Sequence, residues 1–176
     1  MIKLHLGCGT KHIDGYVNID ARYLPGVDEV DNIKFLRKYK PNSVDVIYAC
    51  HVLEHVGRYE VEGVLKRWFE ILKPGGTLRL AVPDFRSICS HYYKNGDLKS
   101  IMGLLYGGQD YDGNFHYVTF DFHTLNTTLT NIGFQNVQTY DRDKTEHAHI
   151  DDFSNSYIPH MDKNGLLMSL NIEAKK

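Results

Sequence analysis

The chain has 176 residues, a length typical of one folded domain, and at this size it needs no disulfide or metal to hold a core. Hydrophobic residues make up 42% and charged residues 24%, and no apolar run approaches the roughly 20 residues of a membrane span, so we expect a water-soluble protein that does not insert into a membrane. The formal net charge of -2 gives no electrostatic reason to expect nucleic acid binding, and the three cysteines lack the close pairing of a disulfide framework or a CxxC zinc site.

The first half of the chain predicts four strands. Residues 2–6 are typical of a short buried strand and not of a signal peptide, which favours a cytoplasmic location. Residues 16–19 predict a second strand closed by Asp20, and residues 28–33 a weaker third strand. Residues 44–50 form a continuous apolar run, which indicates a strand covered on both faces.

Helices and further strands follow. The region 58–72 predicts an amphipathic helix, because its apolar residues recur at spacings of three and four: Val61, Val64, Leu65, Trp68, Phe69 and Leu72. Residues 73–76 (KPGG) end it, and 77–82 predict the next strand. One or two helices are expected across 85–106, another around 121–131, and strands at 134–140 and 166–174. The polar stretch 141–165 is too long for a tight hairpin and indicates a lid or an interface.

Alternation of strands and helices, without a linker or repeat, predicts one α/β domain over residues 1–176 with a mainly parallel sheet. Ligands of such sheets bind beyond the carboxyl ends of the strands.

A glycine-rich turn directly follows the first strand. Gly7 and Gly9 let the backbone turn sharply and approach a ligand, and Asp20 at the end of the second strand is placed to accept hydrogen bonds from ribose hydroxyls. Asp31, Asn32 and the Ile33 amide could bind an adenine. Because only ten residues separate Gly9 from Asp20, the chain fits a nicotinamide dinucleotide enzyme poorly.

Three ordered segments, LHLGCGTKHIDGYVNID, SVDVIYACHVLEHV and LKPGGTLRLAVPDF, resemble the motifs of class I S-adenosylmethionine-dependent methyltransferases, and most of all the short "type 11" group. The resemblance implies a Rossmann-like sheet of seven strands with an antiparallel last strand and helices on both faces. It also implies S-adenosylmethionine as cofactor and S-adenosylhomocysteine as product. The cofactor would contact residues that end the first four strands: Gly7, Cys8, Gly9, Thr10, Asp20, Asp31, Asn32, Ile33, Cys50 and His51. The segment between Gly9 and Asp20 is too short for the first helix of the family.

Residues 51–55 (HVLEH) also match the HxxEH pattern of zinc peptidases, in which two histidines bind the metal and Glu54 activates water. That reading requires a long helix around the motif, whereas a buried strand is expected to end at Cys50. The strand, the motif and KPGG in this order favour the methyltransferase, so no metal site is predicted.

The methyl acceptor is expected to be a hydroxyl of a small molecule or a glycan. The candidates for a base that removes its proton are His116, His123, His55 and Asp84, in falling order. His147 and His149 are expected at the surface. The alternative is a domain that binds S-adenosylmethionine or S-adenosylhomocysteine without turnover. The oligomeric state is left open by the sequence.

Overall fold

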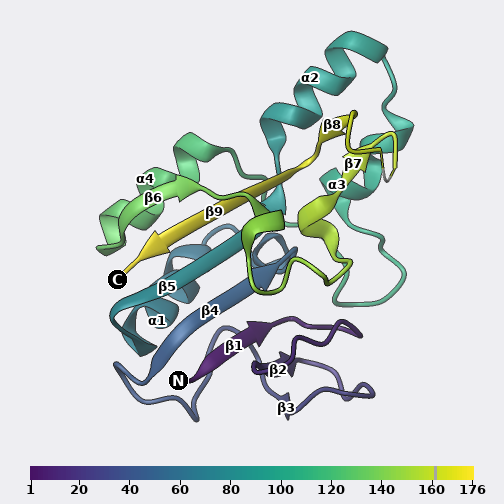
Figure 1. The fold of residues 1–176 in the computed structure, drawn as a ribbon. Helices are drawn as coiled ribbons and strands as arrows, with labels where there is room; N and C mark the ends of the chain where they lie inside the picture. Colours follow the sequence, from purple (N-terminus) through teal and green to yellow (C-terminus); the bar gives the residue numbers. More distant parts are fainter. Residues whose placement is uncertain (161) are drawn as a thin grey trace.

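A seven-stranded sheet forms the centre of the molecule, with strand order β3-β2-β1-β4-β5-β9-β6 (Figure 1). The computed structural model describes residues 1–160 and 162–176. The strands β1 to β5 run parallel, and β9 runs antiparallel between β5 and β6. Their bounds are β1 Lys3–Leu6, β2 Val17–Asp20, β3 Glu29–Val30, β4 Val44–Cys50, β5 Leu72–Pro83, β6 Gln135–Thr139 and β9 Ser169–Lys175. The predicted α/β class and the antiparallel last strand are confirmed.

Helix α1 (Val61–Ile71) begins three residues later than the apolar pattern predicts and ends one residue earlier. Four of the six residues that the spacing indicated are buried in the helix, namely Val61, Val64, Leu65 and Trp68. Phe69 is half-buried, Leu72 is buried as the first residue of β5, and Ile71 is buried without having been predicted. The segment 73–76 does not separate helix and strand as expected. Leu72 already pairs with Val44 and Thr77 pairs with Val46, so the four residues between them form a bulge inside β5.

The chain after β5 is less regular than one long helix. It contains α2 (Phe85–Asn95), the 3₁₀ turn η2 (Lys99–Ile101) and α3 (Met102–Tyr106). Gly96, with φ +62°, ends α2 in the left-handed conformation that glycine adopts without strain. Helix α4 (Phe122–Ile132) follows, and the hairpin of β7 (Tyr157–Ile158) and β8 (Leu166–Leu167) packs near α2. Within the described residues, no helix combines the length and the apolar character needed to cross a membrane.

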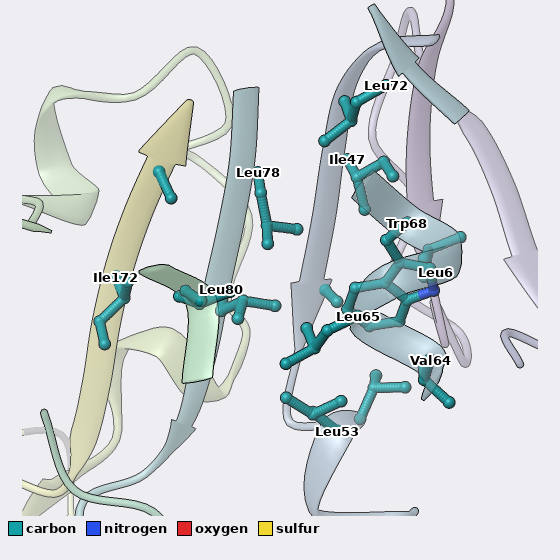
Figure 2. Close-up of a cluster of buried hydrophobic side chains, with 14 of the residues drawn as sticks. Leu6, Ile47, Leu53, Val64, Leu65, Trp68, Leu72, Leu78, Leu80 and Ile172 are labelled. Carbon is teal, nitrogen blue, oxygen red and sulfur yellow. The ribbon is translucent and has the colours of Figure 1, made fainter. Parts of the chain in front are cut away.

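The apolar core lies between one face of the sheet and helices α1 and α4. Alternate residues of each strand point to the same face, and on this face they are leucine, isoleucine, valine and alanine. Figure 2 shows Leu65 and Trp68 of α1 against Leu6 and Ile47 of the strands. Trp68 is fully buried and donates its indole N–H to the Ile33 carbonyl oxygen at 2.9 Å, so its one polar atom is paired.

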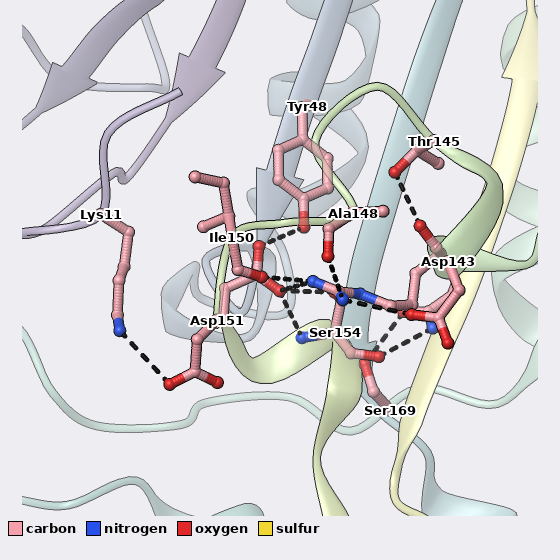
Figure 3. Close-up of polar contacts among 12 residues, drawn as sticks. Lys11, Tyr48, Asp143, Thr145, Ala148, Ile150, Asp151, Ser154 and Ser169 are labelled. Carbon is pink, nitrogen blue, oxygen red and sulfur yellow. Dashed lines mark hydrogen bonds and ion pairs between the residues drawn. The ribbon is translucent and has the colours of Figure 1, made fainter. Parts of the chain in front are cut away.

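The opposite face carries polar side chains and is covered by the segment 141–155. The helical parts of this segment are two 3₁₀ turns, η3 (Arg142–Lys144) and η4 (Phe153–Asn155). Tyr48 of β4, labelled in Figure 3, donates its hydroxyl proton to Asp152 at 2.7 Å. Asn171 of β9 donates to the Ser154 carbonyl at 2.9 Å. The first part of the predicted lid or interface is therefore a cover for the sheet.

His147 belongs to this cover and is buried, which corrects the expectation that it is a surface residue; His149 is exposed as expected. The His147 ring packs against Tyr48 with 4.1 Å between ring centroids. Burial is the main cause that lowers the pKa of His147, to about 4. The surrounding charges act in opposite directions, because Glu146 and Asp152 raise the pKa while Arg79 and His5 lower it.

We expect this histidine to make the protein less stable in mild acid. The unfolded chain takes up a proton near pH 6.5 and the folded chain does so only near pH 4, so stability is lost as the pH falls through this window. Between pH 7 and pH 4.5 the loss from His147 should be about 2 kcal/mol. Urea unfolding of wild type and His147→Phe across this range measures it. Parallel pH profiles for the two proteins would contradict the prediction, and His149→Gln serves as the exposed control.

Candidate functional site

Most of the residues predicted to bind the cofactor meet at one edge of the sheet. The carboxyl ends of β1, β2, β3 and β4 carry Gly7, Asp20, Asp31 and Cys50 respectively. Because these four strands are parallel neighbours, their ends form one continuous rim.

The loop after β1 turns without a helix, as the short spacing predicted. Residues 7–16 form turns in which Gly7 has φ +63° and Gly9 has φ +54°. A Cβ on Gly7 would lie 2.3 Å from a methyl carbon of Val52, so glycine is required there by space as well as by φ. The Cys8 amide donates to the Ile19 carbonyl at 3.0 Å, which fixes the loop to β2, and Thr10 lies exposed at its tip.

Asp20 is held between this loop and the chain that follows β2. Oδ2 accepts the Gly9 amide at 2.8 Å, and Oδ1 accepts the Arg22 amide at 2.9 Å and its Nε at 3.1 Å. The residue is only 5% exposed. A carboxylate offers about four acceptor positions, so one remains open, and a second opens when the half-exposed Arg22 side chain moves.

The three residues after β3 lie beside Asp20. The Asp31 amide donates to the Asp20 carbonyl at 3.1 Å, and Asp31 in turn accepts the Asn32 amide at 2.7 Å. Ile33 is half-buried, with its carbonyl held by Trp68. These contacts leave the Asn32 side chain exposed at the rim.

Cys50 and His51 end β4. Burial raises the pKa of the Cys50 thiol, and nearby Asp152 raises it further, so this thiol stays protonated at neutral pH. Burial likewise raises the pKa of Cys8 to about 11. His51 has φ +52°, a strained value for a residue with a side chain, and its Nε2 lies 3.1 Å from the Ser169 hydroxyl at the start of β9.

The turn η1 (Leu53–His55) places Glu54 and His55 beside His116. The rings of His55 and His116 are 4.8 Å apart between centroids, and Nε2 of His116 is 4.0 Å from Oε1 of Glu54. The Tyr117 amide donates to the Glu54 carbonyl at 2.8 Å, which fixes the segment around His116 to the turn. Two of the four predicted base candidates, far apart in sequence, therefore lie together.

The charges of this cluster act on one another. Burial would raise the pKa of Glu54, but His51, with Nδ1 at 3.2 Å, and His55 lower it by more, so the net shift is downward. Burial lowers the pKa of His116, although Glu54 opposes the shift. Glu54 is thus a carboxylate and His116 a neutral imidazole at pH 7.

A cavity of about 400 Å³ opens beside His116. Its other lining residues come from the chain around α3, the loop after η1 and the segment before α4: Arg58, Leu105, Tyr106, Tyr117, Val118 and Thr119. It offers both apolar surface and hydrogen-bonding groups, which suits a small polar molecule.

The other two base candidates lie elsewhere. Asp84 begins α2, where its side chain accepts the Arg86 amide at 3.1 Å and the Ser87 hydroxyl at 2.8 Å. It also lines a second cavity, of about 340 Å³, with Ser169. His123 lies exposed on α4. Both remain predictions, with a helix cap as the evident role of Asp84.

Two features of the rim were not predicted. Arg22 covers Asp20, and its guanidinium lies 4.4 Å from the centre of the Tyr111 ring, which joins the loop after α3 to the cofactor edge. The contact of Arg22 with Asp20 had a signal in the sequence, because a basic residue follows Asp20 by two positions. The contact of Arg22 with Tyr111, in the loop 107–115, had no such signal.

The HxxEH peptidase arrangement is not formed, because η1 is a single 3₁₀ turn and not a long helix.

Comparisons with known proteins agree with this architecture. A family model described as a methyltransferase domain matches residues 8–139. No curated protein matches the chain in sequence.

Similar solved structures include a SAM-dependent methyltransferase from Methanosarcina mazei, with 19% identity and a TM-score of 0.60 over 99% of this chain and 91% of that one. A SAM-dependent methyltransferase from Archaeoglobus fulgidus has 15% identity and a TM-score of 0.58 over 99% and 85%. A possible histamine N-methyltransferase from Thermotoga maritima has 18% identity and a TM-score of 0.56 over 99% and 82%. At these identities the similarity shows the fold.

Proposed function

The chain belongs to the class I S-adenosylmethionine-dependent methyltransferases, and we propose that it transfers the methyl group to a hydroxyl oxygen of a small molecule or glycan. The observation that carries the proposal is the meeting of two features at one rim. The loop of Gly7 and Gly9 and the carboxylate of Asp20 lie on the cofactor side, and the cavity beside His116 lies on the acceptor side.

The residues at the rim fit S-adenosylmethionine. The turn of Gly7 and Gly9 brings bare backbone to the strand ends, and Asp20 keeps an acceptor position open for a ribose hydroxyl. We assign Gly7 to Thr10 to the methionine part, Asp20 to the ribose, and Asp31 to Ile33 to the adenine. Cys50 and His51 are assigned to the surroundings of the sulfonium. The cofactor supplies an electrophilic methyl group, which the acceptor oxygen takes as the bond from carbon to sulfur breaks.

The chain's own contribution is then to hold the acceptor in line and to receive its proton. His116 lines the cavity, and its Nδ1 donates to the Leu104 carbonyl at 2.9 Å, so Nε2 carries a lone pair. His55 is arranged in the same way, with Nδ1 donating to the Phe115 carbonyl at 3.0 Å. A neutral imidazole at the cavity suits a hydroxyl acceptor, because a hydroxyl must lose its proton as the new bond forms. Arg58, Tyr106 and Thr119 offer hydrogen bonds of the kind that sugars use.

Asp20→Asn should weaken S-adenosylmethionine binding by tenfold or more, or about 1.4 kcal/mol. The amide keeps the shape and can still accept the Gly9 amide, but it loses the charge that favours two ribose hydroxyls. Calorimetric titration with S-adenosylmethionine and S-adenosylhomocysteine measures this, with NAD as the control ligand. Asp14→Asn, an exposed change of equal charge in the same loop, should leave the affinity unchanged.

Equal affinity in Asp20→Asn and wild type would overturn the assignment of Asp20, and no binding of either ligand by folded wild type would overturn the function. The acceptor is identified by transfer of a labelled methyl group to sugars and small hydroxyl compounds, with amines in parallel. Transfer to amines alone would contradict the hydroxyl assignment and leave methyl transfer in place.

A further inference from the structure

The carboxylate of Glu54 is completely buried yet poorly satisfied. The residue is 0% exposed, and among the described residues neither of its side-chain oxygens has a hydrogen-bond partner. Nδ1 of His51 lies 3.2 Å from Oε1, close enough for an ion pair but not aligned as a hydrogen bond. Buried carboxylates are normally paired or bind a metal, so a second cationic partner is expected here.

The two histidines beside Glu54 present bare nitrogens. His55 and His116 each donate Nδ1–H to a backbone carbonyl, of Phe115 and Leu104, at 3.0 and 2.9 Å. A backbone carbonyl accepts but cannot donate, so in both rings the proton is on Nδ1 and the Nε2 lone pair is free. Histidines that bind metals are typically oriented by this same contact of the opposite ring nitrogen.

We propose that Glu54, His55 and His116 bind one divalent transition-metal ion, for which Zn²⁺ is the probe. One ligand atom from each of the three residues can be chosen so that all lie within 4.8 Å of one another. Two imidazoles and a carboxylate suit zinc and its first-row neighbours, whereas magnesium and calcium prefer oxygen ligands. Ligands about 2.1 Å from zinc lie about 3.4 Å apart, so binding would draw the side chains together by about 1 Å.

Three protein ligands leave at least one coordination position for another molecule. His116 also lines the 400 Å³ cavity, so the ion would lie beside the space assigned to the acceptor. Resting on the proposed function, the ion orients the acceptor hydroxyl there and makes it more acidic. With the ion bound, His55 and His116 are ligands, which replaces the role of base that the proposed function gives to His116 in the absence of metal. The proton then leaves to solvent as the bond to the methyl carbon forms. This departs from the expectation, drawn from the sequence, of no metal.

The test is metal binding by the purified chain of 176 residues, freed of metal by dialysis against a chelator. Zn²⁺ binding is measured by competition with a chromophoric chelator, and Co²⁺ is added as a spectroscopic probe of the ligand geometry. We expect one ion per chain. His55→Gln and His116→Gln should each weaken Zn²⁺ binding at least 100-fold and change the visible Co²⁺ absorption. His149→Gln, an exposed change of the same kind, should alter neither.

Circular dichroism checks that each variant is folded. Glu54→Gln, which changes the third proposed ligand, is measured in the same way. Folded wild type without stoichiometric Zn²⁺ binding would overturn the proposal, as would binding that the His55 and His116 variants retain. Calorimetry with S-adenosylmethionine distinguishes failure of the proposed metal site from failure of the proposed function. Cofactor binding without metal binding overturns the metal site alone, and metal binding without cofactor binding overturns the proposed function while leaving the site.

Discussion

Gly7→Ala is expected to lower the free energy of unfolding by about 3 kcal/mol. Two costs combine. A residue with a side chain at φ +63° loses about 1–2 kcal/mol, and the new Cβ would lie 2.3 and 2.9 Å from the two methyl carbons of Val52. Val52 is itself buried in the core, so it cannot move aside without disturbing its neighbours. Urea unfolding followed by circular dichroism measures the loss.

Gly15→Ala separates these costs. Gly15 also has a positive φ, +79°, but no heavy atom lies within 4 Å of the position of its Cβ. Gly15→Ala should therefore lower the free energy of unfolding only by the backbone cost, about 1 kcal/mol. The double variant Gly7→Ala with Val52→Ala should be more stable than the sum of its single changes predicts, because the collision is removed. Equal losses in Gly7→Ala and Gly15→Ala would show that Val52 gives way freely.

The structural features of the rim that the sequence predicts correctly are those set by local rules. The turn of Gly7 and Gly9, the end of β2 at Asp20 and the end of β4 at Cys50 each depend on a few neighbouring residues and on the direction of parallel strands. Strand β4 was predicted with the bounds that it has, because a continuous apolar run of seven residues has few other places in an α/β protein.

The misplaced features depend on contacts between distant segments. Nothing near His147 in the sequence indicates burial; it is buried because Glu146 beside it binds Lys3 of β1, Arg79 of β5, and Tyr16 directly before β2. The bulge at 73–76 likewise follows from pairing with β4, since the local signals of proline and glycine indicate only an end to the helix. Such pairings have no local pattern from which to predict them.

The histidines illustrate the same limit at the site itself. The sequence placed His55 and His116 among the candidate bases because of their residue type and the segments in which they lie. His55 adjoins Glu54 in the chain, and His116 is brought to them by the backbone contact between Tyr117 and Glu54, 63 positions apart. The chemistry of the cluster belongs to the tertiary structure, and so do its proposed ligands.

Arg142 holds the cover over the second face of the sheet, and Arg142→Met should cost about 3 kcal/mol. The residue is 8% exposed and donates to the carbonyl oxygens of Ala148, at 2.7 Å, and Ile150, and to the Ser154 hydroxyl at 3.1 Å. These acceptors gather at one point in Figure 3. Methionine preserves much of the volume but donates nothing, so buried carbonyls and the carboxylate of Asp152, 3.6 Å from the guanidinium, lose their partner.

Lys144→Met is the matched control, because its side chain is 82% exposed and its ion pair with Asp141 should contribute less than about 0.5 kcal/mol. Urea unfolding gives the global loss, and hydrogen exchange of the amides in 145–155 shows whether the cover opens first. A segment that detaches by itself limits the global loss and appears as faster exchange confined to those amides. Unchanged stability together with unchanged exchange would mean that the buried guanidinium does not hold the cover, and that Tyr48 and Asn171 suffice.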